Sequence, residues 1–84
     1  MVVAYVLVST EIGAEGKVLE HLEKFPEIEE AYIIYGIYDI IAKISLEDET
    51  KLRDIIMRIR RLDGVKSTLT IQVVRGFSRG KGGT

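Results

Sequence analysis

The chain has 84 residues, 46% of them apolar and 30% charged, with no cysteine, one histidine and a formal net charge of −1. This length allows one small hydrophobic core, and the lack of cysteine excludes disulfides and thiolate metal sites as added sources of stability. The balanced charge describes a globular protein and gives no general reason to bind nucleic acid. The apolar start of the sequence lacks the pattern of a signal peptide, so we expect a cytoplasmic protein. With no disulfide or thiolate metal site, we expect oligomerisation to add the stability that a small core lacks.

The first half of the chain predicts a strand and then a helix. Residues 2–8 are β-branched and aromatic, which favours a strand, and the run is too short to cross a membrane. From Gly13 the apolar residues recur at spacings of three and four, which predicts an amphipathic helix. Pro26 should stop this helix, because the residue before a proline is disfavoured in the α region.

The second half predicts a hairpin, a helix and a final strand. Residues 28–35 and 38–44 are rich in β-forming residues, and we expect a tight reversal at Gly36 that uses positive φ. Residues 52–62 repeat apolar side chains with helical spacing, and Gly64 should cap that helix. Residues 65–74 form the last expected strand, and the basic, glycine-rich residues 75–84 are expected to be a flexible tail.

The order βαββαβ predicts an α+β, ferredoxin-like fold within residues 1–74. In this plan two helices cover one face of a four-stranded antiparallel sheet. The other face should then alternate apolar and polar residues, but residues 2–8 are apolar at both alternating sets of positions. An apolar patch of that size usually has a partner, so we expect dimerisation through this second face. The absence of asparagine and the single glutamine also suit a thermophile.

Residues that could carry catalysis or bind a metal are few. His21 lies among charged positions of the first expected helix, where a solvated role is the simpler interpretation. No acidic or histidine cluster has metal-ligand spacing, and no nucleophile or phosphate-loop motif occurs; Gly13 and Gly16 alone are a weak signal. We therefore expect no catalytic residue, no metal and no cofactor.

Two polar features interrupt the apolar strands. Asp39 follows Gly36 in a β-rich run, and Thr68 and Thr70 share one face of the last strand. A site for a free amino acid needs a carboxylate that pairs with its ammonium group, hydrogen-bond donors for its carboxylate and an apolar wall for its side chain. The simpler interpretation gives the threonines β-propensity and gives Asp39 a turn-capping role, paired with Lys43 or Lys66.

The hairpin also resembles a known family. The segment from Ala31 to Lys43, with Gly36 and Asp39 as a Gly-x-x-Asp motif, resembles the effector-binding RAM domain of Lrp/AsnC transcription regulators. The helix ending in Phe25-Pro26-Glu27-Ile28 and the strand Ser67-Thr68-Leu69-Thr70 extend the resemblance over residues 2–74.

The resemblance implies an amino-acid-binding regulatory domain. Family members dimerise through their sheets and assemble into rings, commonly octamers, with amino acids bound between dimers. Carried over by position, the ligand-binding residues are Tyr35, Gly36, Tyr38, Asp39, Thr68 and Thr70, and the motif does not decide which tyrosine faces the ligand. Full-length members begin with a helix-turn-helix domain, so this chain looks like the stand-alone version. We then expect no direct DNA binding; the chain would act either through its own assembly or by co-assembly with a full-length regulator.

Two other classes share this topology. In an ACT-type amino-acid domain the ligand loop follows the first strand, so Gly13 or Gly16 would matter and Asp39 would not. A dimeric α+β barrel enzyme would place a histidine, aspartate or arginine in a deep cavity beneath the sheet, and the sequence offers only the outward His21.

Overall fold

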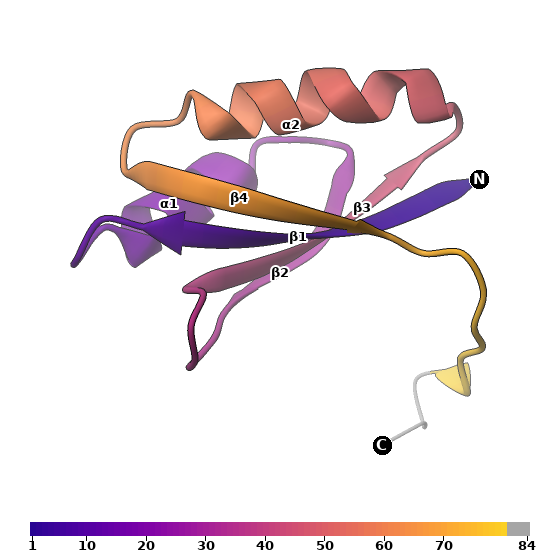
Figure 1. Cartoon of the computed structure of the whole chain (residues 1–84), viewed down its shortest axis with the longest axis horizontal. Helices are drawn as coiled ribbons and strands as arrows, with labels where there is room; N and C mark the ends of the chain where they lie inside the picture. The colour runs from indigo at the N-terminus through magenta and orange to yellow at the C-terminus, as the bar shows by residue number, and fades with distance from the viewer. Residues whose placement is uncertain (81–84) are drawn as a thin grey trace.

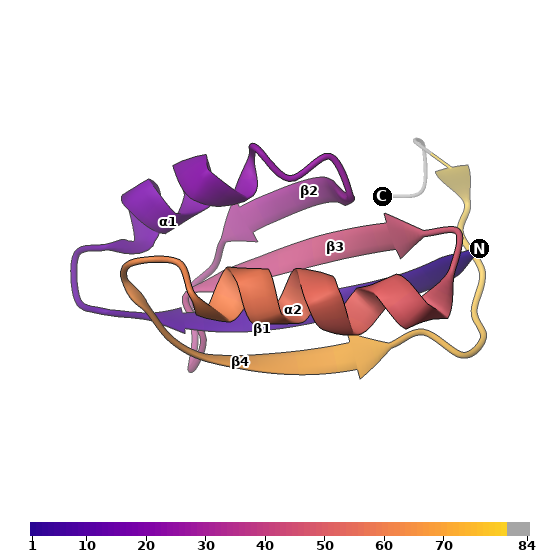
Figure 2. The same cartoon turned by 90° about the horizontal axis from the view of Figure 1, so that it is seen from above.

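The computed structural model describes residues 1–80 and confirms the α+β, ferredoxin-like arrangement. The elements follow in the order β1 (Val2–Thr10), α1 (Glu15–Leu22), β2 (Ile28–Ile33), β3 (Ile40–Leu46), the short 3-10 helix η1 (Glu49–Lys51), α2 (Leu52–Arg60) and β4 (Val65–Gln72). The four strands form one antiparallel sheet in the order β2-β3-β1-β4. Both helices lie over the same face of this sheet (Figures 1 and 2).

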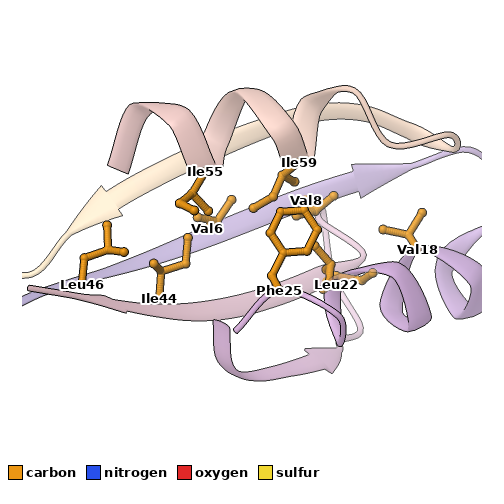
Figure 3. Close-up of a cluster of buried hydrophobic side chains, with 10 residues drawn as sticks. Val6, Val8, Val18, Leu22, Phe25, Ile44, Leu46, Ile55 and Ile59 are labelled. Atoms are coloured by element: carbon orange, nitrogen blue, oxygen red, sulfur yellow. The ribbon is translucent and has the colours of Figure 1, made fainter. Parts of the chain in front are cut away.

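One core fills the space between the helices and the sheet. Every second residue of β1 and β3 points into it, since Ala4, Val6 and Val8 are fully buried while their neighbours are only partly buried. Figure 3 shows side chains from α1 and α2 meeting this face of the sheet. The buried cluster contains Val6, Val8, Val18, Leu22, Phe25, Ile40, Ile44, Leu46, Ile55 and Ile59. The helical spacing of the sequence therefore predicted which side chains of α1 and α2 face the core, whereas β1 is apolar at both alternating sets of positions and its sequence did not indicate which set is buried.

Two expected turns differ in detail. Gly64 has φ +96, but α2 already ends at Arg60, so Gly64 belongs to the turn into β4 and does not cap the helix itself. An added Cβ at Gly64 would lie 3.1 Å from the side chains of Ala14 and Val18, which ties this turn to the start of α1. The predicted tight reversal at Gly36 is wrong: Gly36 has no positive φ, and residues 34–39 form a longer connection.

The face of the sheet opposite the helices carries no covering element within residues 1–80. Val3, Tyr5 and Leu7 of β1 lie on this open face, and the cross-strand register sets Ile41 opposite Leu7. On the edge strand β4, Leu69 and Ile71 are 44% and 49% exposed. The sequence predicted that this face would be apolar. Glu30 and Lys43 also lie on it, near β2, so the open face is only partly apolar. The expected sheet-to-sheet dimer stays a prediction.

The chain leaves the sheet after Gln72, with the Val73 amide still donating to the Val3 carbonyl at 2.8 Å. Phe77 is 82% exposed, and the Arg79 guanidinium lies 4.8 Å from the centre of its ring. In Figure 1 this segment descends on the side of the sheet away from the helices. The flexible tail expected for residues 75–84 stays a prediction, and its last four residues lie outside the described part of the chain.

Candidate functional site

The connection from β2 to β3, residues 34–39, is held by backbone hydrogen bonds at its base. The Ile34 amide donates to the Asp39 carbonyl, and the Asp39 amide donates to the Val8 carbonyl, both at 2.9 Å. At the tip, Tyr35 and Ile37 are essentially fully exposed. A Cβ added at Gly36 would meet no atom within 4 Å. The loop therefore has a fixed base and an open tip whose backbone another molecule could approach.

Asp39 is half-buried and has a defined structural partner. Its Oδ2 atom accepts a hydrogen bond of 2.8 Å from the Thr10 backbone amide at the end of β1. This bond satisfies part of the hydrogen-bonding capacity of a carboxylate in an apolar strand region, as the capping interpretation expected. That interpretation paired Asp39 with Lys43 or Lys66, but the Lys43 ammonium lies 3.4 Å from Glu29 and 3.9 Å from Glu30, and residues 1–80 show no ion pair between Lys66 and Asp39.

Thr68 and Thr70 lie on the helix side of β4. Their cross-strand partners are Val8 and Val6, which face the core, so the two threonines share a face as predicted. Thr68 is half-buried, and the exposed Thr70 lines a groove of about 450 Å³ between α2 and β4. The hydroxyl row thus borders α2 and not the open face.

The structure does not bring the two polar groups together within one chain. The strand β1 lies between β3, which Asp39 precedes, and β4, which carries both threonines. The two tyrosines also differ, because Tyr38 is half-buried and Tyr35 is fully exposed. Asp39 and the two threonines therefore belong to parts of the sheet that are not adjacent within one chain.

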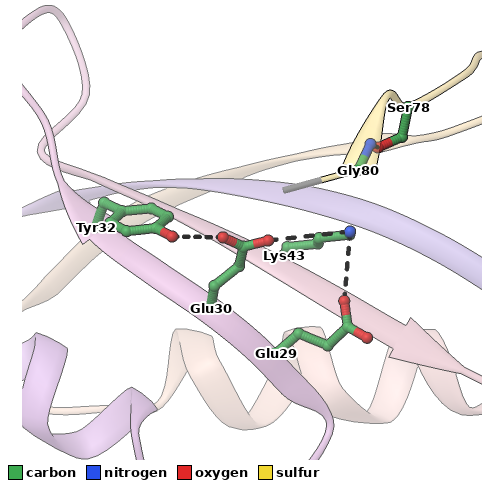
Figure 4. Close-up of polar contacts among 6 residues, drawn as sticks. All are labelled: Glu29, Glu30, Tyr32, Lys43, Ser78 and Gly80. Atoms are coloured by element: carbon green, nitrogen blue, oxygen red, sulfur yellow. Dashed lines mark hydrogen bonds and ion pairs between the residues drawn. The ribbon is translucent and has the colours of Figure 1, made fainter. Parts of the chain in front are cut away.

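A polar cluster on the open face was not anticipated from the sequence. Figure 4 shows Lys43 between Glu29 and Glu30, with the Tyr32 hydroxyl donating to Glu30. The hydrogen bond to Glu29 raises the pKa of Lys43, and the hydrogen bond to Glu30 raises the pKa of Tyr32. The available signal was Lys43 itself, a lone cation in the apolar β3. Its pairing had to be read from the register between β2 and β3.

Thr10 is a second residue that the sequence did not single out. It is only 6% exposed, its amide binds Asp39, and its hydroxyl has no hydrogen-bond partner in the described part of the chain.

Residues 1–80 hold no group of three or more histidine and acidic side chains placed to bind a metal ion. In the same residues, no helix has the length and apolar run that crossing a membrane requires.

Comparison with known proteins decides the family. The model of the Lrp/AsnC ligand-binding domain matches residues 3–82. The chain belongs to the Lrp/AsnC family. A curated relative of this Lrp/AsnC domain is an uncharacterized HTH-type transcriptional regulator, PH0140, from Pyrococcus horikoshii. The two are 36% identical over 70 residues, which is 82% of this chain and 44% of the regulator. The chain therefore spans less than half the length of that regulator.

Two further matches show where similar domains occur. The crystal structure of TTHA0845 from Thermus thermophilus superposes with a TM-score of 0.87 at 30% identity, covering 94% of this chain and 100% of that one. A homocitrate synthase from Sulfurisphaera tokodaii is 40% identical over 58 residues, which is 69% of this chain but 13% of the synthase. The synthase match is thus confined to a small part of that enzyme.

Proposed function

We propose that this Lrp/AsnC ligand-binding domain is a self-assembling module that binds a free amino acid and couples its occupancy to assembly. The observation that carries the proposal is the separation of Asp39 from Thr68 and Thr70 by β1, with each group open to a second molecule. In this proposal, a site built from both groups forms between copies. Ligand binding then favours the assembled state, because a ligand shifts an equilibrium by its differential affinity for the two states.

Self-association through the open face is the first step of this proposal. Tyr32, Leu69 and Ile71 are about half exposed there, and Val3 and Leu7 lie between them. Soluble monomers rarely leave such a continuous apolar surface in water, and a small core benefits from the added burial. A second copy packed sheet against sheet would cover this surface in a two-fold dimer. An octameric ring of such dimers is the assembly that the family resemblance suggests.

The proposed ligand contacts follow from the chemistry of each group. The carboxylate of Asp39 is held by Thr10 through Oδ2, which leaves Oδ1 to accept from an α-ammonium group. The backbone around Gly36 is sterically open, and Thr68 and Thr70 of a neighbouring copy can donate to an α-carboxylate. Tyr38 is half-buried beside Asp39, so we assign Tyr38, in preference to the exposed Tyr35, to the apolar wall.

The wider role that we propose is regulatory, with no catalytic step. The chain would act in the cytoplasm, either alone or by co-assembly with a full-length Lrp/AsnC regulator whose own domain contacts DNA. A transcription regulator among the relatives supports this role. The alternative of an α+β barrel enzyme would require a histidine, aspartate or arginine in a deep cavity beneath the sheet, and His21 lies on α1 outside the buried residues of that helix.

Thermal unfolding of the whole chain with each of the twenty amino acids tests the proposal. A ligand at about 100 times its Kd stabilises the folded state by about 2.7 kcal/mol, which raises the melting temperature by about 10–20 °C. We expect at least one amino acid to give such a shift, and Asp39→Asn to remove it.

Gly16→Ala is the matched control for an ACT-type site. An added Cβ at Gly16 meets no atom within 4 Å, so this variant should fold and keep the shift. The proposal fails if no amino acid at millimolar concentration changes the melting temperature. An ACT-type site is favoured if Gly16→Ala abolishes the shift while Asp39→Asn retains it.

A further inference from the structure

The chain ends in a segment whose charge is opposite to that of the rest. Residues 1–74 contain nine basic and thirteen acidic side chains, whereas residues 75–84 contain three basic and no acidic ones. The net charge of −1 therefore combines an acidic domain with a short basic segment. The part of this segment that the structure describes, residues 75–80, is called the basic tail below.

The basic tail is exposed and holds an aromatic ring against an arginine. Every residue from 75 to 80 is exposed, and Phe77 is 82% exposed. The Arg79 guanidinium lies 4.8 Å from the centre of the Phe77 ring, within the range of a cation–π contact. A short turn follows, in which the Gly80 amide donates to the Ser78 hydroxyl at 3.3 Å (Figure 4). The arginine covers only part of the ring, so the rest of the aromatic surface is open to a partner.

The cations of the basic tail have no partner in the described part of the chain. Within residues 1–80 both ion pairs involve Lys43, and neither Arg75 nor Arg79 takes part in one. Figure 1 shows the tail leaving the domain beyond the end of β4, away from both helices. A guanidinium with free N–H groups can bind a phosphate through two parallel hydrogen bonds. The tail thus offers two phosphate-binding groups, one on each side of an open aromatic residue in the sequence.

We propose that the basic tail binds single-stranded nucleic acid, with Arg75 and Arg79 on the phosphates and Phe77 stacked on a base. Binding of single strands without sequence preference combines cations that follow the backbone with aromatic rings on which bases stack. Both kinds of group occur here within five residues. Gly76 and Gly80 restrict the backbone little, so the tail can adapt to the path of a strand. This contact differs from operator recognition, which needs an element that enters a groove.

The chemistry of the tail favours a single strand over a duplex or an anionic membrane. In a duplex the bases stack on one another, so a ring outside the helix cannot reach their faces. Recognition of anionic lipid usually takes a cluster of about four to eight cations beside a membrane-inserted or amphipathic segment. Residues 75–84 have three cations and Phe77 as their one large apolar side chain. The acidic domain would also be repelled by a broad anionic surface, whereas a strand can contact the tail alone.

Fluorescence anisotropy with labelled oligonucleotides of about eight nucleotides tests the proposal on the whole chain. Oligo(dT) and oligo(rU) distinguish DNA from RNA as the source of the strand. At about 0.05 M NaCl we expect at least one of them to bind with a Kd of about 1–100 μM. Each neutralised phosphate of a single strand contributes about −0.7 to the slope of log K against log salt, so the three cations of residues 75–84 predict a slope of about −2.

Two sets of variants separate the phosphate contacts from the stacking contact. Arg75→Gln with Arg79→Gln should weaken binding at least tenfold and reduce the salt slope to about −0.7, because one cation remains. Phe77→Ala should weaken binding roughly tenfold and leave the salt slope unchanged, since stacking involves no charge. Phe77→Tyr keeps the ring and should bind like the wild type.

A matched pair of substitutions outside the tail controls for net charge. Lys17→Gln with Lys24→Gln removes two exposed cations of the domain and should bind the oligonucleotides like the wild type. Asp39→Asn should also bind them like the wild type, because this contact does not rest on the proposed amino-acid site.

Four outcomes would overturn the proposal. Neither oligonucleotide binds at about 100 μM protein, the lysine pair weakens binding as much as the arginine pair, or Phe77→Ala binds like the wild type. The fourth is tighter binding to a duplex of the same length, or to phosphatidylserine-containing vesicles, than to the single strands. Circular dichroism of each variant should match the wild type, because all the substituted side chains of the tail lie outside the core.

Discussion

Asp39 combines a structural role with a proposed ligand role, and two substitutions should separate them. Asp39→Ala removes the oxygen that accepts the Thr10 amide at 2.8 Å. A hydrogen bond to a charged group contributes about 1.5–3 kcal/mol, and partial exposure of this one lets water replace some of it, so we expect a loss of about 1–1.5 kcal/mol. In a domain of this size that loss lowers the melting temperature by about 5–10 °C.

Asp39→Asn should behave differently, because its amide oxygen can still accept from Thr10 while the negative charge is lost. We expect this variant to unfold close to the wild-type temperature and yet to bind an amino acid at least tenfold more weakly, which calorimetric titration measures. The capping argument is refuted if Asp39→Ala unfolds at the wild-type temperature. The ligand argument is refuted if Asp39→Asn binds as tightly as the wild type.

Three further outcomes test the core, the open face and the pH dependence. Ile59→Ala leaves a cavity at a fully buried position, and urea denaturation should show that the free energy of unfolding falls by about 2–5 kcal/mol. A change near zero would contradict the single-core description. Leu7→Lys places a charge on the open face, and light scattering should show fewer dimers with an unchanged circular dichroism spectrum, whereas unchanged dimers would exclude that face. The Thr50 amide lowers the pKa of Asp48 below its ordinary value of 3.8, so the stabilisation from this carboxylate is present above that pH and is lost as the pH falls through the folded-state pKa. In Asp48→Asn the free energy of unfolding should therefore fall less steeply as the pH is lowered through the acid range. An unchanged pH dependence would argue against this cap.

The fold could be predicted from the sequence because its signals are local. The β-forming composition of residues 2–8 and the helical spacing of Val18 and Leu22 depend only on near neighbours in the chain, and the structure has a strand and a helix there, with Val18 and Leu22 buried. Pro26 was expected to stop the first helix, and the structure ends this helix earlier, at Leu22. The reversal at Gly36 was misjudged because a six-residue connection spreads the turn and leaves the glycine without positive φ.

The site was less predictable because its contacts join distant parts of the chain. Asp39 binds the amide of Thr10, 29 residues away, and a backbone donor carries no signal in the sequence. Alternation showed that Thr68 and Thr70 share a face but not which face, since that depends on pairing with β1. The capping interpretation paired Asp39 with Lys43 or Lys66, but the β2–β3 register places Glu30 directly opposite Lys43.

The central claim is that amino-acid binding and assembly are coupled, and sedimentation velocity of the whole chain tests it most directly. The protein is measured across a range of concentrations, without ligand and with a saturating amino acid identified by the thermal screen. The account predicts that ligand shifts the distribution toward larger species and that Asp39→Asn removes the shift. An unchanged distribution in the presence of a bound amino acid would contradict the account.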